Sequence, residues 1–293
     1  MGKLTATLFT DPGCPWAYSE NPALAVLQWR YAEELDWRLV TIGLSESTAH
    51  YERLGYTPTK MARGYRGFRR YGMPFATEPR SRVAATGRAC RAIVATRLRQ
   101  PELELPVLRA LQFGWFTTAL VLDEDDQIAA ALKDVPGLDV RALVAALDDP
   151  DVVAAYEADK KEARQALGGP TEFQGKARNS DGEVRFTAPS LVFEDAGGRR
   201  LEAGGFQPVE AYDVVIANFP PASRPERRDP PASPLEAARF FRWPLTTQEI
   251  AAVMARGNDA PDRAAAEDAL IELAAAGEVR RIALGDDALW ARA

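Results

Sequence analysis

A cysteine at a strand-to-helix turn is the feature that most limits how this chain can fold. Residues Leu4 to Thr10 are apolar and β-prone, which predicts a strand. Asp11-Pro12-Gly13 predicts a turn, and Pro15 is typical of the first turn of a helix, where its missing N–H costs nothing. Cys14 therefore stands between strand and helix. Because free N–H groups and the positive end of the helix dipole meet there, we expect a stabilised thiolate at Cys14.

Two separated motifs resemble those of the DsbA-like thioredoxin-fold oxidoreductases. Cys14-Pro15-Trp16-Ala17 is similar to the Cys-Pro-Trp-Cys active site of that family, with Ala17 in place of the second cysteine. Residues 186–193, which contain Ala188-Pro189, are similar to the cis-proline loop of the family and the apolar strand that follows it. The resemblance covers roughly Lys3 to Phe219. It implies an α/β, thioredoxin-like fold with a helical insertion.

The resemblance also implies roles for individual residues. Cys14 would be the catalytic nucleophile, and the substrate-binding residues would be Pro15, Trp16, Ala17, Ala188 and Pro189. Ala17 cannot attack a mixed disulfide, so we do not expect the usual two-cysteine oxidation. One-thiol chemistry remains, in which a second molecule of a small thiol resolves the mixed disulfide. Glutathione or mycothiol would serve as this co-substrate, and no tightly bound cofactor is expected.

These motifs predict an intracellular thiol oxidoreductase, or a transferase that depends on a low-molecular-weight thiol. In either case one reactive cysteine would act, and the substrate would be a small thiol or a protein thiol. Two alternatives stay open. One is a non-catalytic binding protein on the same fold. The other is a glutathione-dependent isomerase similar to the 2-hydroxychromene-2-carboxylate isomerases, which would turn over a small aromatic substrate without net oxidation of thiol.

Composition narrows the partners and the location. The chain has 293 residues and a net charge of −6, which argues against nucleic acid or an anionic membrane as the main partner. No signal-like apolar run follows Met1 and no segment is long enough to span a bilayer, so we expect a cytoplasmic protein. Two cysteines and one histidine make a disulfide scaffold and a zinc site implausible. Abundant Ala and Arg indicate a bacterial source.

Hydrophobic periodicity predicts a βαβ unit, a block of helices and a closing ββα unit. The first unit is a strand over 3–11, a helix over 15–34 and a strand over 36–42. The block, from about 45 to 168, has no convincing strand, and its helices are predicted at 59–71, 78–99, 102–118, 126–133, 140–147 and 150–167. A loop over 168–182, a hairpin of 191–194 with 200–202 and a helix over 208–218 complete this domain of residues 1–219.

Prolines concentrate after this domain, and they predict a stiff, solvated linker over 220–234. The remaining residues, 235–293, show three helices and a hairpin, an order that resembles a winged helix. Their net charge is −3, and the helix over 261–276 is mostly acidic, so it would repel a DNA duplex. We therefore expect a module for packing or for homodimerisation and not a transcriptional regulator.

Other aromatic and titratable residues have plainer interpretations. Trp16 and Tyr18 could line a pocket beside Cys14, whereas the cluster Phe113 to Phe116 is more typical of core. His50 has no neighbours that would mark it as a catalytic base. Cys90 falls on the buried stripe of a helix and is expected to be structural.

Arginines are concentrated after His50, at positions 63, 66, 69, 70, 80 and 82. A run of this kind is usually a solvated face. The alternative is that these arginines bind the carboxylates of a glutathione-like thiol.

Overall fold

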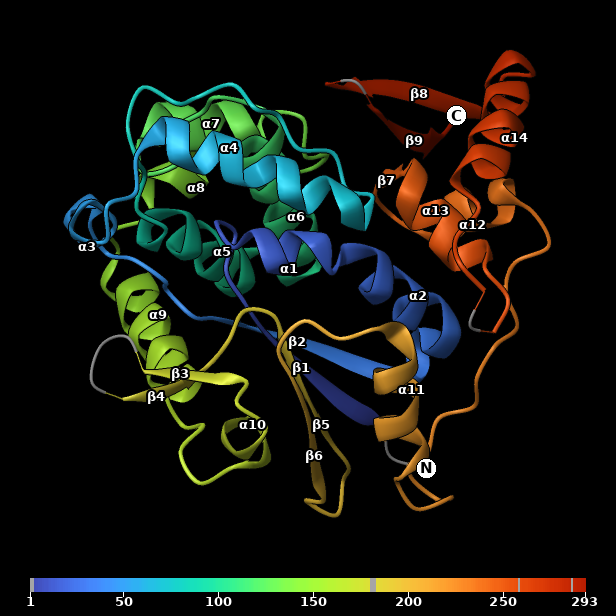
Figure 1. The fold of residues 1–293 in the computed structure, drawn as a ribbon, viewed down its shortest axis with the longest axis horizontal. Coiled ribbons are helices and arrows are strands. Elements are labelled where there is room, and N and C mark those ends of the chain that lie inside the picture. Colours follow the sequence, from blue (N-terminus) through green and yellow to red (C-terminus); the bar gives the residue numbers. More distant parts are fainter. Residues whose placement is uncertain (1–2, 180–182, 258, 286) are drawn as a thin grey trace.

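A four-stranded sheet stands at the centre of the computed structural model, which describes residues 3–179, 183–257, 259–285 and 287–293 (Figure 1). Its order is β2-β1-β5-β6, formed by β1 (Leu4–Thr10), β2 (Leu35–Thr41), β5 (Ser190–Glu194) and β6 (Arg200–Gly204). Strand β1 runs parallel to β2 and antiparallel to β5, and β6 is antiparallel to β5. The predicted thioredoxin-like sheet, built from a βαβ and a ββα unit, is therefore confirmed.

Strand β1 is buried on both faces because it is an inner strand covered by helices. Ala6 and Leu8 belong to the main hydrophobic core. Phe9 points to the opposite face, where its ring stacks on Phe186 at 4.2 Å. A near-continuous apolar run is typical of such a strand. Its last residue leads directly into the turn that carries Cys14.

The first helix is divided, in contrast to the single helix predicted over 15–34. It forms α1 (Pro15–Ser19) and α2 (Asn21–Tyr31), followed by a 3₁₀ turn over Ala32–Glu34. Pro22 explains the break, since a proline has no N–H to donate to the preceding turn. The break also turns the Glu20 side chain inward, where it meets Tyr212 of α11 (Val209–Ala217).

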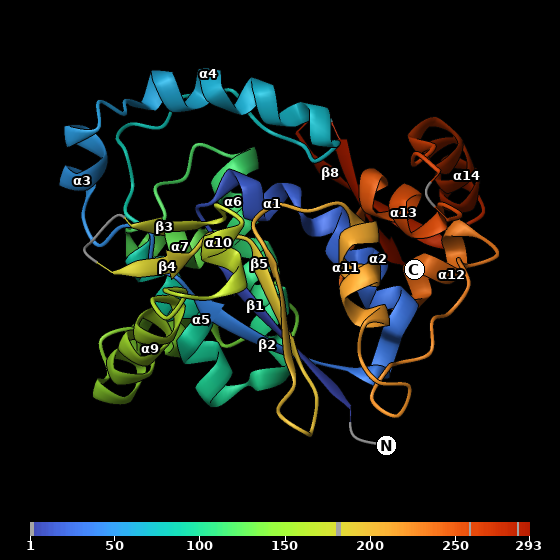
Figure 2. The ribbon, with the colours of Figure 1, turned by 60° about the horizontal axis from the view of Figure 1, so that its bottom comes forward.

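The helical insertion is present, and within the described residues no strand lies between 45 and 168. It contains α3 (Thr48–Arg53), α4 (Pro58–Phe68), α5 (Gly87–Arg99), α6 (Glu104–Thr117), α7 (Asp125–Leu132), α8 (Val140–Ala145) and α9 (Pro150–Ala163). Helix α3 was not predicted. The helix expected over 78–99 begins only at Gly87, because polar contacts hold the residues before it in an irregular conformation. In Figure 2, α3 and α4 form an arm along one side of the molecule.

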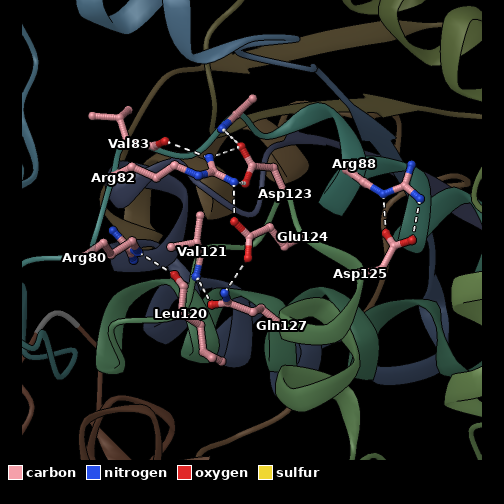
Figure 3. A network of polar contacts seen from close by, with 11 residues as sticks. Arg80, Arg82, Val83, Arg88, Leu120, Val121, Asp123, Glu124, Asp125 and Gln127 are labelled. Carbon is pink, nitrogen blue, oxygen red and sulfur yellow. Dashed lines mark hydrogen bonds and ion pairs between the residues drawn. The ribbon is translucent and has the colours of Figure 1, made fainter.

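Those polar contacts form the network drawn in Figure 3. Arg80 Nε donates to the Leu120 carbonyl at 2.7 Å. Arg82 forms ion pairs with Asp123 and Glu124, and the Asp123 carboxylate also accepts from the Ala85 N–H at 2.9 Å. The Arg82 side chain is 42% exposed, so it lies on a solvated face as predicted, and both arginines also hold the segment before α5 against the α6–α7 connection.

The stretch predicted as a loop, 168–182, contains short regular elements. Helix α10 (Pro170–Phe173) is followed by β3 (Ala177–Asn179), which pairs antiparallel with β4 (Val184–Phe186). The loop prediction is therefore wrong for these elements, and residues 180–182 lie outside the described residues. The β3–β4 hairpin stands beside the main sheet near α10, as both ribbon views show.

The C-terminal residues contain the predicted helices and hairpin. They form α12 (Pro234–Phe240), β7 (Leu245–Thr246), α13 (Thr247–Met254), α14 (Arg263–Ala275), β8 (Val279–Leu284) and β9 (Asp287–Arg292), with sheet order β7-β9-β8. A capping box opens α13, between Thr246 and Glu249. Strand β7 was not expected.

One hydrophobic core joins α2 to this C-terminal region. Val26 and Trp29 of α2 pack in the same cluster as Ile250 and Leu270. The Pro-rich segment also lies against α2, since Trp29 Nε1 donates to the Asp229 carbonyl at 2.8 Å. Most residues of 220–234, Asp229 among them, are exposed, so the segment is solvated as expected, and this contact ties it to α2.

Candidate active site

The turn before Cys14 is fixed by the buried carboxylate of Asp11. Its Oδ1 accepts from the Gly13 N–H at 2.9 Å, and its Oδ2 accepts from the Leu44 N–H and the Thr86 hydroxyl, both at 2.9 Å. The turn is thereby tied to the segment after β2 and to the start of α5. From the sequence, Asp11 was expected only to be part of the turn before Cys14. Burial raises the pKa of Asp11, and these hydrogen bonds oppose the rise.

Position 13 requires a glycine because the side chains of Thr86 and Trp115 lie very close to its backbone. A Cβ at this position would lie 2.6 Å from Thr86 Cγ2 and 2.9 Å from Trp115 Cζ2. Such distances are too short for non-bonded carbon atoms, so a side chain would displace either Thr86 or the ring. Trp115 and Phe116 are buried, as the core interpretation of that cluster predicts.

The Cys14 sulfur faces the loop that arrives from the other half of the domain. Cys14 is the N-cap of α1, and its Sγ donates to the Ala188 carbonyl at 3.1 Å. The Ala188–Pro189 peptide bond is cis, as the resemblance implies. Two residues 174 positions apart in the chain are thus in direct contact. The predicted proximity of Cys14 and the Pro189 loop is confirmed.

The predicted stabilisation of a Cys14 thiolate is wrong for this form of the protein. Burial raises the pKa of Cys14 to about 12, and the residue is only 6% exposed. The backbone N–H groups of Ala17 and Trp16 and the charge of Arg185 favour the thiolate, but they do not outweigh burial, and Asp11 opposes them. Helix α1 has five residues, so it contributes little dipole. At neutral pH the sulfur is a thiol that donates to Ala188.

The second cysteine of the chain lies behind the turn. Cys90 is fully buried, and its thiol donates to Asp11 Oδ2 at 3.5 Å. Its structural role in α5 is therefore confirmed. Ala17, at the position of the missing second cysteine, is 2% exposed and packs with Cys14 in a small core cluster. Both cysteines are free thiols.

A pocket opens in front of Cys14. It is lined by residues from the start of α1, from the segment after β2, from the segment around β3 and β4, and from the loops before β5 and after β6: Cys14, Trp16, Leu44, Gly175, Lys176, Arg178, Arg185, Thr187, Ala188, Gly205 and Phe206. Trp16 is 37% exposed and lines this pocket, as considered from the sequence. Its ring packs against Phe206 at 5.3 Å and Phe68 at 4.9 Å. The Trp16 and Phe206 rings therefore form an aromatic part of the pocket that contains Cys14.

Two residues considered for this site lie elsewhere. Tyr18 does not line the pocket, because it is fully buried and its hydroxyl donates to the Pro74 carbonyl at 3.0 Å. His50 contacts the ring of Tyr51 and is not among the residues that line the pocket.

The comparisons with known proteins agree with this geometry. A family model described as a DSBA-like thioredoxin domain matches residues 5–185. The chain belongs to this family. A search of curated proteins found no match. The DSBA-like model ends before Ala188 and Pro189, so the cis-proline loop of this chain is known from its own structure.

Solved structures show the same DSBA-like fold. A probable DsbA oxidoreductase from Streptomyces coelicolor has a TM-score of 0.54 at 18% identity, covering 74% of this chain and 92% of that one. The cytosolic disulfide reductase DsbM from Pseudomonas aeruginosa has a TM-score of 0.50 at 17% identity, covering 73% of this chain and 97% of that one. Because both identities are below 20%, these two structures support the fold alone.

Sequence inspection missed the cations that line the pocket. Lys176, Arg178 and Arg185 come from the stretch that was predicted as a loop and from the strand after it. The sequence analysis instead considered the arginines after His50 as carboxylate-binding residues, but none of them is among the residues that line the pocket. The positive charge of Arg178 and Arg185 was visible in the sequence, but their position beside Cys14 depends on the β3–β4 pairing.

Proposed function

We propose that this DsbA-like chain is a thiol oxidoreductase, or a thiol-dependent transferase, that works through the single sulfur of Cys14. The observation that carries the proposal is the 3.1 Å contact between Cys14 Sγ and the Ala188 carbonyl. The sulfur lies beside the peptide group before Pro189, and Cys14 and Ala188 line the same pocket. A substrate whose backbone lies along that peptide group would present its own sulfur to Cys14.

The proposed reaction needs no second cysteine in the chain. The Cys14 thiol loses its proton to solvent, and the thiolate attacks one sulfur of a disulfide while the other leaves as a thiolate that takes up a proton. Glutathione or mycothiol, as a thiolate, then attacks the mixed disulfide and releases Cys14. The net change exchanges one disulfide for another, so no further oxidant or reductant is consumed.

Two other parts of the proposal concern location and the C-terminal region. DsbM, which has the same fold, is named a cytosolic disulfide reductase, and we place this chain in the cytoplasm too. Within the described ranges, no helix is both long and apolar enough to cross a bilayer. We assign the C-terminal residues 235–293 as a winged-helix-like module whose role is packing, because α13 shares a core with α2.

A non-catalytic binding protein is the second candidate. The observation that favours it is the burial of Cys14, which keeps the sulfur protonated in this form. A binding protein would use the same pocket without forming a covalent bond to sulfur. The two candidates therefore differ in one measurable property, which is turnover.

Glutathione-dependent reduction of hydroxyethyl disulfide, coupled to glutathione reductase and NADPH, tests the proposal. We expect Cys14→Ser to lose turnover by at least about 100-fold, because it removes the nucleophile. Cys90→Ser keeps a hydroxyl donor toward Asp11, so it should retain most of the rate. Because burial raises the pKa of Cys14, the rate should climb from about pH 7 to about pH 9 without a plateau. Equal rates for wild type and Cys14→Ser would favour the binding protein.

A further inference from the structure

We propose that the C-terminal module holds the aromatic part of the pocket, formed by Trp16 and Phe206, in place, with Arg263 as a positioning residue. The proposal rests on the function proposed above for Cys14. It goes beyond the packing role of the module. It also adds the class of group that the pocket accepts beside the reacting sulfur, which is planar and apolar.

Tyr71, the last residue of the 3₁₀ turn that follows α4, packs against both of these rings. Its ring centroid lies 4.7 Å from that of Phe206 and 5.6 Å from that of Trp16. Tyr71 is not one of the described residues that line the pocket, so it supports the two rings without forming the pocket surface. Aromatic pairs at such distances stabilise each other. The position of Tyr71 therefore fixes the aromatic surface that a substrate meets beside Cys14.

The segment that ends the α3–α4 arm is attached to the C-terminal module. Arg263 of α14 donates from Nη1 to the Gly72 carbonyl at 3.1 Å. The Gln248 side chain of α13 lies so close to the Gly72 backbone that a Cβ there would be 2.3 Å from Gln248 Cδ. The Thr246 hydroxyl donates to Sδ of Met73, which is 1% exposed, at 3.6 Å. Figure 2 shows the end of α4 close to the C-terminal strands.

The Arg263 guanidinium is itself held by a buried carboxylate. Its Nη2 donates to Asp287 Oδ2 at 2.8 Å, and the Asp287 side chain is 6% exposed. Asp287 Oδ1 accepts from the Thr247 hydroxyl at 3.3 Å and from the Ala288 N–H at 2.8 Å. One side chain therefore joins the start of β9 to the Gly72 carbonyl, so the arm cannot shift there without breaking a hydrogen bond.

These contacts link the C-terminal module to the reacting sulfur. Arg263 binds Gly72, Gly72 follows Tyr71 directly, and Tyr71 supports the two rings of the pocket. Without the Arg263 hydrogen bond, Tyr71 would no longer be held at a fixed distance from those rings. A planar apolar group bound against them would then lose contact, whereas a small aliphatic group would be little affected.

The test compares an aromatic and an aliphatic disulfide on the full-length protein. Cys14 forms a mixed disulfide with one half of 2,2′-dithiodipyridine or of hydroxyethyl disulfide, and the other half leaves as a thiolate that takes up a proton. Intact mass with peptide mapping follows both reactions at about pH 8.5. We expect Arg263→Met to slow the aromatic reaction by about fivefold and the aliphatic reaction by less than about twofold. The control, Arg239→Met, removes an arginine that pairs with Glu278 within the same module and should change neither rate.

A double variant shows whether Arg263 acts through Tyr71. Tyr71→Ala should slow the aromatic reaction at least as much as Arg263→Met, and Arg263→Met/Tyr71→Ala should react like Tyr71→Ala alone. Two unrelated structural losses would instead add. An unchanged ratio of the two rates in Arg263→Met, or additive losses in the double variant, would overturn the positioning role and leave the proposed function standing. Failure of both disulfides to label Cys14 in the wild type would overturn both proposals.

Discussion

Replacing Arg109 by methionine is expected to lower the free energy of unfolding by about 3–5 kcal/mol. Arg109 of α6 and Glu249 of α13 are buried, and their side chains form a two-point ion pair at 2.5 and 2.9 Å. Glu249 also closes the capping box of α13 by accepting from the Thr246 N–H at 2.8 Å. Without Arg109, a buried carboxylate would lose its counter-ion at the contact between the insertion and the C-terminal region.

Urea unfolding measures this effect, and the chain offers a matched control. Arg239 and Glu278 form an ion pair whose side chains are 58% and 45% exposed, so Arg239→Met should cost less than about 1 kcal/mol. Arg109→Met/Glu249→Leu should recover much of the loss, because it removes both buried charges. Similar costs for Arg109→Met and Arg239→Met would contradict the buried ion pair.

Replacing Glu20 by glutamine is expected to stabilise the protein increasingly as pH rises. Glu20 is 1% exposed, its Oε1 accepts from the Tyr212 hydroxyl at 2.8 Å, and its Oε2 has no partner among the described residues. Burial raises the pKa of Glu20 to about 8, from 4.5. Between these values the folded protein holds a proton that the unfolded chain has lost, so stability falls as pH rises through this window.

Glutamine cannot ionise, so the variant lacks this loss. The difference in unfolding free energy should grow by about 1.4 kcal/mol per pH unit and level off at roughly 5 kcal/mol above about pH 8. Urea unfolding at about pH 5, 7 and 8.5 checks it, with Glu278→Gln as an exposed control. A pH dependence of stability that is the same in Glu20→Gln and wild type would show that Glu20 is already ionised in the folded protein.

Local patterns were sufficient to predict the sheet and the position of Cys14. The apolar run of β1, Pro15 at the helix start and the Ala188-Pro189 motif are short-range features, and the structure brings them together as expected. The break at Glu20 was also visible in principle, because Pro22 interrupts the helix. Boundaries in the insertion were less accurate because tertiary contacts, such as those of Arg82, keep the residues before α5 out of the helix.

Properties that depend on burial or on distant residues could not be predicted. The backbone N–H groups of Trp16 and Ala17 favour the Cys14 thiolate, as expected at a helix start, but the loss of solvent around the sulfur has the larger effect on the pKa. The β3–β4 hairpin has three-residue strands, too short to produce a recognisable alternation. The contact of Arg109 with Glu249 spans 140 positions, so no local pattern marks it.

Intact-protein mass spectrometry with peptide mapping is the most direct test of chemistry at Cys14. Reduced wild-type protein is incubated with glutathione disulfide at about pH 8.5 and then quenched with acid. We expect a single glutathionyl adduct on the peptide that contains Cys14, removed by dithiothreitol. Protein that stays unmodified, or that carries the adduct on Cys90 alone, would contradict the proposal that Cys14 exchanges disulfides.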